Sequence, residues 1–460
     1  MNMHRYLLRL LQCFTYLLVS MQSGFSQDAA PGSTLRELLQ LGETNYPLLK
    51  SKMLEVQAAQ KGVDASQRSI VPSLDVSYQA NYATYNNITG MAYPQFLVPI
   101  SGPPSADNKY SGVFGSATSL LLNWQPVTFG QRQSQVDLAR AGVQYAQADA
   151  QNEIFQHKIR VVNAYLDIIA AIELEKVYQE NLARTEANLS VAKTLVINGI
   201  KPGVDTALLK AEVSRARVDL LNSRKFKEQT IITLSGLLAT DSLPSFADSS
   251  YFNKVPSTRM ASDTLKNPIL ALFSSDVELS KAKKKVLSKT AMPTLGVWGT
   301  AYARGSGIDN NGNVKTTDGL GFQRYNYGVG LQLSVPILQF ARIRPQLQQH
   351  DFQIRSNEEK LNEVALQVEK QNQLADTILS TALAVAQESP LFFESASFSY
   401  KALQSRYQSG LANFADLMQA QYVLVKAATD NKTAFIGAWK ALLYKAAVNG
   451  DLNLFLNQVN

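Results

Sequence analysis

The chain has 460 residues, of which 45% are hydrophobic, so it is long enough to bury a substantial core. Its net charge of +7 is a mild excess, and the basic residues are scattered rather than interleaved with aromatics, so no nucleic-acid partner is expected. The sole cysteine, Cys13, lies in an N-terminal apolar stretch, which excludes a disulfide framework and thiolate chemistry from the expected mature chain.

The N-terminus has the order of a secretory signal peptide. Two arginines precede the apolar residues 10–19, and the small residues Gly24 and Ser26 stand where a cleavage site requires them. We expect cleavage before Gln27, which leaves a net charge of 42 − 37 = +5. No second run of 18 or more apolar residues follows, so no membrane-spanning helix is expected. Such an exported chain is periplasmic, secreted or an outer-membrane β-barrel.

The second half of the sequence repeats landmarks of the first. Pro47 corresponds to Pro268 (268 − 47 = 221), and two glycine-to-aspartate turns, residues 198–205 and 409–416, lie 211 positions apart. Several such offsets in order indicate an internal duplication. We expect a signal peptide at 1–26, a first helix-strand-strand-helix repeat at 35–238, an equatorial linker at 239–263 and a second repeat at 264–454.

Each repeat is expected to begin with a helix that leads into two strands. Residues 47–69 have apolar side chains at three- and four-residue steps, and Pro72 closes this helix. From Leu74 the period falls to two, so one face of the strand is apolar and the other polar. A returning strand is predicted for residues 111–124, with less regular alternation.

The second repeat predicts strands at 295–304 and 325–335. About ten residues tilted at roughly 45° cross a bilayer, and the polar side of the last strand carries small and amide residues, as a wet lumen would. The alternative is an ordinary strand of a β-sandwich. Four strands cannot close a barrel, and open edges are not tolerated in lipid. Other copies must supply the rest, and three copies would give twelve strands.

Very long helices occupy the remaining sequence. Residues 131–197 contain no proline and would extend about 100 Å, with apolar spacing typical of a coiled coil. Their counterpart is residues 343–408, with Pro390 as an expected kink. The shorter helices at 47–69 and 204–238, placed end to end, would accompany the first long helix. The predicted fold class is therefore mainly α with a small β part.

The duplicated motifs match a known family. They are Pro72-Ser-Leu and Pro293-Thr-Leu before the strands, the run from Gln125 to Arg132, and the two glycine-to-aspartate turns. Jointly and in order, they make residues 35–454 resemble the TolC family of outer-membrane efflux channels. The resemblance implies a homotrimer with a twelve-stranded transmembrane β-barrel in the outer-membrane lipid. A long coiled-coil α-helical barrel would continue from it into the periplasm.

The resemblance also implies the function and its partners. The chain would passively conduct substrates to the exterior from a periplasmic adaptor, or membrane fusion protein, and an inner-membrane pump of the RND or ABC type. That is the channel of a tripartite efflux or type I secretion system. The alternative is an exported structural coiled-coil stalk or adhesin anchored by short strands. Drug efflux, metal-cation efflux and protein secretion all stay open, because pump and adaptor select the substrate.

In such a channel, the two turns would lie at the periplasmic tip of the tunnel. The candidate pore or gate residues are Asp205, Asp416 and Gln419. Six carboxylates from the two aspartates of a trimer would favour cations, whereas the alternative is that each aspartate caps a helix. The family can carry a second aspartate at position 419 and a latching arginine at position 412, where this chain has Gln419 and Ala412.

Two further sets of residues complete the candidate sites. Glycine-hydrophobe pairs of this family dock the adaptor, and the alternative is burial of the hydrophobe against its own helices; the pairs here are Gly199 with Ile200 and Gly410 with Leu411. Aromatic residues near strand ends are candidates for the membrane interface, with generic strand propensity as the alternative. They are Tyr78, Tyr82, Trp124, Trp298, Tyr325 and Tyr327.

No pattern in the sequence indicates an enzyme. His157 and His350 are isolated on predicted helices without metal-ligand spacing. The chain has no nucleophile elbow or phosphate loop, and the adjacent Glu358 and Glu359 are expected on a solvated helix surface. We therefore expect no catalytic residue, no metal site and no cofactor.

Overall fold

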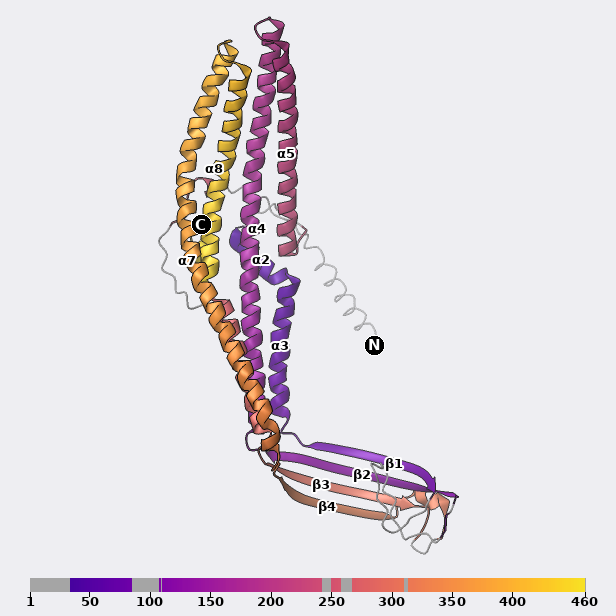
Figure 1. Ribbon diagram of the computed structural model, residues 1–460. Coiled ribbons are helices and arrows are strands. Elements are labelled where there is room, and N and C mark those ends of the chain that lie inside the picture. Colours follow the sequence, from indigo (N-terminus) through magenta and orange to yellow (C-terminus); the bar gives the residue numbers. More distant parts are fainter. Residues whose placement is uncertain are drawn as a thin grey trace, which may run out of the picture. The chain divides into compact units, whose positions relative to one another are not determined.

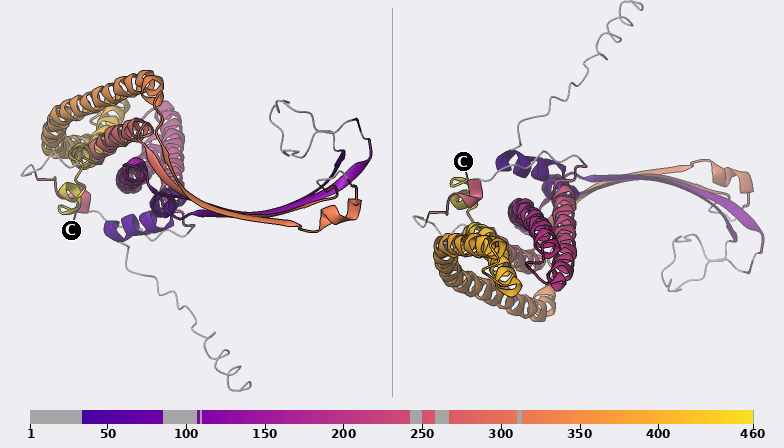
Figure 2. Two further views of the ribbon diagram at one scale, coloured as in Figure 1. Left: turned by 90° about the horizontal axis from the view of Figure 1, so that it is seen from below. Right: turned by 90° about the horizontal axis from the view of Figure 1, so that it is seen from above.

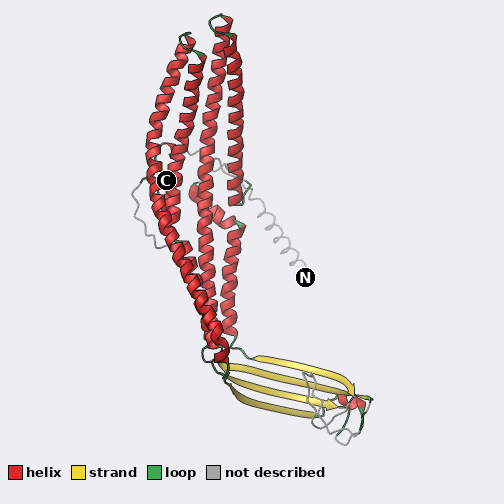
Figure 3. Ribbon diagram, viewed as in Figure 1, coloured by secondary structure: helices red, strands yellow, loops and turns green. Residues whose placement is uncertain are grey.

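The computed structural model describes residues 34–84, 107–108, 110–241, 250–257, 267–309 and 313–459. The expected signal peptide, with Cys13, and parts of the linker lie outside these residues. The described chain is mainly helical with a single four-stranded antiparallel sheet (Figure 3). Within the described residues, no helix combines the length and apolar character needed to cross a membrane.

The two repeats have the same order of elements. The first contains α3 (Pro47–Arg68), β1 (Ser73–Thr84), β2 (Gly112–Val127), α4 (Gln131–Ile197) and α5 (Gly203–Leu238), and the second contains α6 (Pro268–Lys289), β3 (Thr294–Ser306), β4 (Arg324–Ser334), α7 (Gln339–Gln408) and α8 (Phe414–Asn449). Short elements flank these repeats: α2 (Leu35–Asn45), η1 (Ser250–Phe252), η3 (Thr316–Leu320) and α9 (Asn453–Leu456). The prediction of four strands and of paired long and short helices is confirmed.

One helix was absent from the sequence prediction. Helix α2 was not anticipated, although the side chain of Thr34 accepts from the backbone N–H of Glu37 in a capping box that the sequence carries. Pro390, the position of the expected kink, lies inside the single helix α7.

The helices and strands form two compact units, and each unit combines parts of both repeats. Unit 1 contains residues 1–50, 153–267 and 369–460, and unit 2 contains residues 51–152 and 268–368. The sequence repeats and the compact units therefore do not coincide, because each unit contains equivalent segments of the first and the second repeat.

Unit 1 contains two helical hairpins, in which the later part of α4 turns into α5 and the later part of α7 turns into α8 (Figures 1 and 2). Its core includes a run of aromatic contacts in which Tyr251 packs edge-on against Trp439, with ring centroids 5.2 Å apart. Trp439 also donates from Nε1 to the carbonyl oxygen of Tyr251 at 3.0 Å. Since Tyr251 belongs to the predicted linker, that segment contributes to the core.

Unit 2 contains the sheet, whose strand order is β1-β2-β3-β4. The register aligns Val76, Leu120, Ala301 and Tyr327 in one row, so alternate residues of all four strands share a face. Most of this apolar face is uncovered in the single chain, where Val76 is 75% exposed and Val329 is 81% exposed, but Ser116 and Ala303 at its loop end are buried. Strands β1 and β4 are the two open edges of the sheet.

The helices of unit 2 are joined by ion pairs and hydrogen bonds. Lys285 of α6 pairs with Asp137 of α4 at 2.7 Å, and Asn357 of α7 donates to the carboxylate of Asp276 in α6 at 3.0 Å. The Asp137 pKa is lowered, mainly by its hydrogen bond from Lys285. These polar contacts set how the helices meet where few large apolar side chains are buried.

Candidate gate and docking turns

The two glycine-to-aspartate turns have the same backbone structure. Gly199 and Gly410 have φ angles of +70° and +77°, in the left-handed region that glycine adopts without a steric penalty. The next amide donates to the carbonyl oxygen five residues earlier, at 2.9 Å from Ile200 and 2.8 Å from Leu411. This Schellman geometry satisfies a carbonyl at each helix end and places the following hydrophobic residue on the turn.

Both turn hydrophobes are exposed. Ile200 is 55% exposed and Leu411 is 72% exposed, so neither is buried against its own hairpin in the way the alternative interpretation required. The two turns lie next to one another, because a Cβ atom added at Gly410 would stand 3.6 Å from Cγ2 of Ile200. The end of unit 1 therefore presents two adjacent apolar side chains, each behind a glycine. We call this end the tip.

Neither aspartate of the turns is a helix cap. The N-cap of α5 is Pro202, and that of α8 is Asn413, whose side-chain oxygen accepts from the backbone N–H of Asp416 at 2.8 Å. Asp205 and Asp416 instead occupy the third position of their helices. The capping interpretation is therefore wrong in detail, although a carboxylate in the first turn still interacts favourably with the helix dipole.

The two aspartates lie in different surroundings. Asp416 is exposed, whereas Asp205 is only 6% exposed and accepts a hydrogen bond from the Tyr407 hydroxyl at 3.2 Å. Because Asp205 is buried, this conformation does not supply the two free carboxylates per chain that a ring of six in a trimer would need. One exposed carboxylate per chain is available at the tip, because packing between the hairpins occupies the other.

The contact between the turns involves two residues that sequence analysis did not identify. Tyr407 of α7 is buried at 1% exposure, and burial together with the charge of Asp205 raises its pKa to about 12. Lys201 donates to the backbone carbonyl of Ala412 at 2.8 Å and lies 5.2 Å from the centre of the Tyr407 ring. We refer to Lys201, Asp205, Tyr407 and Ala412 as the tip cluster, which joins one hairpin to the other.

A buried polar network joins the same hairpins below the tip cluster. Asn188 of α4 donates to Tyr400 of α7 at 2.9 Å and to Gln421 of α8 at 3.0 Å. Gln421 in turn donates to the Thr185 hydroxyl at 2.6 Å. Buried amides that pair in this way fix the register of the helices, because any other alignment would leave polar groups without partners.

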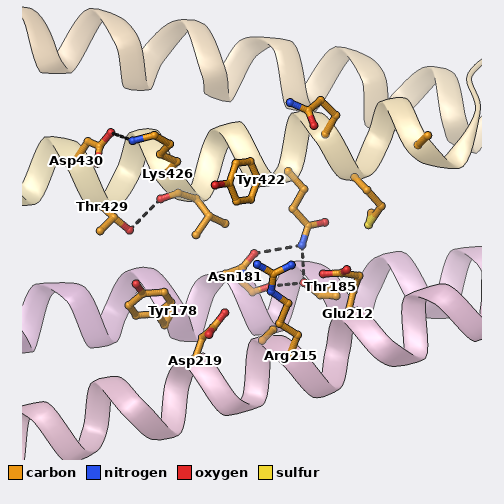
Figure 4. Close-up of a pocket in the computed structure, with 16 residues that line it drawn as sticks. Tyr178, Asn181, Thr185, Glu212, Arg215, Asp219, Tyr422, Lys426, Thr429 and Asp430 are labelled. Carbon is orange, nitrogen blue, oxygen red and sulfur yellow. Dashed lines mark hydrogen bonds and ion pairs between the residues drawn. The ribbon is translucent and has the colours of Figure 1, made fainter.

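Gln419, the third candidate pore residue, is exposed and lines a cavity of about 580 Å³ between α4, α5 and α8 (Figure 4). Arg215 and Asp219 enter this cavity from α5, and Lys426 from α8 forms an ion pair with Asp430 at 2.7 Å. The cavity walls are thus charged, with Tyr178 and Tyr422 as their largest aromatic members, which the figure also shows.

Most candidate interface aromatics share the apolar face of the sheet. Tyr78 and Tyr325 occupy one row of the sheet, and Tyr327 lies in the next row towards the helix end of the strands. Tyr82, nearer the loops, contacts Phe114 with ring centroids 5.0 Å apart. Trp124 lies on the same face at the helix end of β2 and donates to the Ile70 carbonyl at 2.8 Å. Aromatic side chains therefore occupy several levels of this face, including the row that holds Val76 and Leu120.

Trp298 is the exception. The register pairs it with Asn123 and Gly330, which places it on the polar face. A Cβ atom at Gly330 would stand 2.6 Å from the Trp298 ring, so the indole lies over a strand that lacks a side chain there. The assignment of Trp298 to the membrane interface is wrong, because a residue's position along a strand does not reveal its face when both neighbours are glycine or apolar.

The spacing of the aromatic levels fits a bilayer. From Phe114 to Trp124 is 124 − 114 = 10 residues of β2, or about 33 Å along the strand. A tilt of roughly 40° reduces this to about 25 Å, the height of the apolar band of outer-membrane barrels. The intervening side chains on that face include Val76, Leu120 and Val329.

The first repeat of the chain resembles a known protein family. Residues 38–240 match the family described as outer membrane efflux protein, which spans almost the whole first repeat. The second repeat contains the same elements in the same order. The chain is therefore similar to this family over its first repeat. No curated protein sequence matches the chain.

Solved structures of outer-membrane channels share its fold. The CmeC channel of Campylobacter jejuni has 13% identity and a TM-score of 0.73, covering 93% of this chain and 90% of its own. The open state of the MtrE channel of Neisseria gonorrhoeae has 13% identity and a TM-score of 0.70, covering 91% and 89%. CusC has 12% identity and a TM-score of 0.74, covering 93% and 96%. At such identities the likeness concerns the fold.

The remaining candidate chemistry is structural. His157 is 1% exposed and stacks on Tyr46 with ring centroids 4.2 Å apart. Burial, with a smaller contribution from the charge of Arg160, lowers its pKa. Within the ranges that the structure describes, no three His, Cys, Asp or Glu residues cluster as metal ligands would.

Proposed function

We propose that three copies of this chain form a passive outer-membrane efflux channel, with a twelve-stranded barrel in the lipid and a helical tunnel in the periplasm. The observation that carries the proposal is the largely uncovered apolar face of the sheet, whose outermost aromatic levels lie about 25 Å apart. A soluble protein would have to cover this face with another layer of structure.

Closure of the barrel requires further copies. The open edges are β1 and β4, and since neighbouring strands are antiparallel, β4 of one copy can pair antiparallel with β1 of the next. Unpaired backbone groups at those edges would be costly in lipid. Three copies supply twelve strands, the number that the family resemblance implies.

Unit 1 also leaves apolar side chains for a neighbouring copy to cover. Leu221 and Ile232 of α5 are 62% and 69% exposed, and Leu391 and Phe398 of α7 are 63% and 77% exposed. In a ring of helical hairpins, α5 of one chain would pack on α7 of the next. The exposed apolar residues of these two helices suit that arrangement.

The tip would connect the channel to its partners. The exposed Gly199-Ile200 and Gly410-Leu411 pairs suit docking of a periplasmic adaptor, and an inner-membrane pump of the RND or ABC type would deliver the substrate. The tip cluster holds the hairpins together, so its rupture would widen the entrance. Asp416 remains available to attract cations there.

A matched pair of substitutions tests the barrel. Val76→Arg places a charge in the centre of the apolar face, whereas Ser77→Arg places it on the polar face of the same strand. We expect Val76→Arg to lose about 2–4 kcal/mol per chain and to abolish heat-modifiable trimers in outer membranes, while Ser77→Arg retains them.

The same preparation separates the channel from an exported stalk. A stalk predicts a water-soluble rod in which both arginine variants behave alike, whereas the channel predicts extraction by detergent only. Equal trimer yields from the two variants would contradict the barrel.

A further inference from the structure

Two arginines face each other at the loop end of the sheet. Arg304 of β3 pairs with Arg324 of β4, and the row continues through Ala117 of β2 to Gln79 of β1. Both arginines are exposed. Directly opposite residues of antiparallel strands project from one face with Cβ atoms about 5 Å apart, so the two guanidinium groups share one surface.

This pair is not explained by stability, because like charges opposite each other weaken a sheet. Within the described part of the chain, neither arginine forms an ion pair; Arg324 donates to the carbonyl of Gln323 at 3.2 Å. Asp309, in the loop after β3, is held by the side chain of Asn313 at 2.9 Å. The other acids in the two connecting loops are Asp107, between β1 and β2, and Asp318, between β3 and β4.

The row lies on the polar face, together with Tyr302 two residues earlier in β3. The proposed function, on which this step rests, makes that face the lumen and the loop end the external exit. We propose that Arg304 and Arg324 of three copies form an anion-binding ring at the exit. Its ligands are small organic anions bearing carboxylate, phosphate or sulfonate groups, and aromatic ones gain contact with Tyr302.

The strength of the ring follows from its dimensions. Twelve strands about 4.8 Å apart and tilted by roughly 40° give a radius of about 12 Å, so six charges on arginine side chains lie about 10 Å from the axis. With the dielectric constant of water and 0.1 M salt, they enrich a monovalent anion about fivefold. At 1 M salt, screening reduces the enrichment to about one.

Phosphates of outer-leaflet lipid are a different source of anions. They would require the arginines to face outward, but the register places Tyr325 and Ala303 on the apolar face and their neighbours Arg324 and Arg304 on the other. The observations therefore favour a ligand in the lumen.

The test is equilibrium binding of the aromatic trianion pyranine to detergent-solubilised full-length trimers, followed by fluorescence anisotropy. The ring enriches an anion about fivefold for each negative charge that the anion carries, and pyranine carries three. The double variant R304Q/R324Q is therefore expected to bind pyranine at least tenfold more weakly than the wild type at 0.1 M salt. Lys315→Gln is the control, since it removes one exposed charge from the loop between β3 and β4 but not from the sheet. Binding to the wild type should disappear at 1 M salt.

The outcomes are distinguishable. Trimers of the double variant that bind pyranine as tightly as the wild type would overturn the ring, and so would an equal loss with Lys315→Gln. If the double variant instead loses co-purifying lipopolysaccharide without losing pyranine, the arginines face lipid and the ring is wrong. Failure of the wild type to form trimers would refute the proposed function itself.

Discussion

The hydrogen bond between Tyr407 and Asp205 offers the most direct test of the tip. Tyr407→Phe removes one hydroxyl and leaves the buried carboxylate of Asp205 without its donor from the opposite hairpin. Hydrogen bonds to charged groups contribute about 1.5–3 kcal/mol. A loss of about 2 kcal/mol corresponds to about a 30-fold rise in the ratio of open to closed tips.

Single-channel recording in planar bilayers measures this ratio as open probability. Tyr422→Phe is the control, because it removes a hydroxyl from an exposed tyrosine of α8. Adding Asp205→Ala to Tyr407→Phe should change little further, since the two side chains form one interaction. If Tyr407→Phe trimers open no more often than Tyr422→Phe trimers, the tip cluster does not hold the entrance closed.

The pH dependence of opening follows from the same contact. The pKa of Tyr407 is raised to about 12 in the folded chain from 10.0, so its stabilising effect is complete below pH 10 and is lost as the pH rises through about 12. Open probability should therefore be constant from about pH 6 to pH 9 and increase above about pH 10. A change of open probability in the neutral range would point to another group.

Three other results are expected. Asp416→Asn should reduce cation selectivity and divalent block, and unchanged selectivity would remove its pore role. Leu411→Asp should abolish cross-linking to the adaptor while trimers persist, whereas Ser409→Asp on the same turn should not; equal cross-linking by both would remove the docking role. Because the pKa of His157 is lowered, its contribution to stability is present above about pH 6.5 and is lost on acidification. The Tm of the wild type and of the control His350→Gln should therefore fall as the pH drops below about 6.5. The Tm of His157→Gln should not show this fall.

The sequence by itself determined the repeat, the four strands and the lengths of the main helices. Local chemistry specifies these features: alternation with a period of two for Tyr325 to Leu333, proline at Pro72 before a strand, and glycine at Gly199 and Gly410 where φ is positive. The same reasoning placed Tyr78, Tyr82, Tyr325 and Tyr327 on the apolar face, because a regular pattern reveals its face without the neighbouring strand.

Only the tertiary structure decided which side chains meet. Asp205 and Asp416 occupy equivalent positions in the two repeats, yet one is buried under Tyr407 and the other is exposed, because the hairpins contact each other asymmetrically. Trp298 faces the polar side because the register sets it against Gly330, and the pairing of Arg304 with Arg324 follows from that same register. Contacts between residues distant in sequence depend on how the elements pack, which no local pattern encodes.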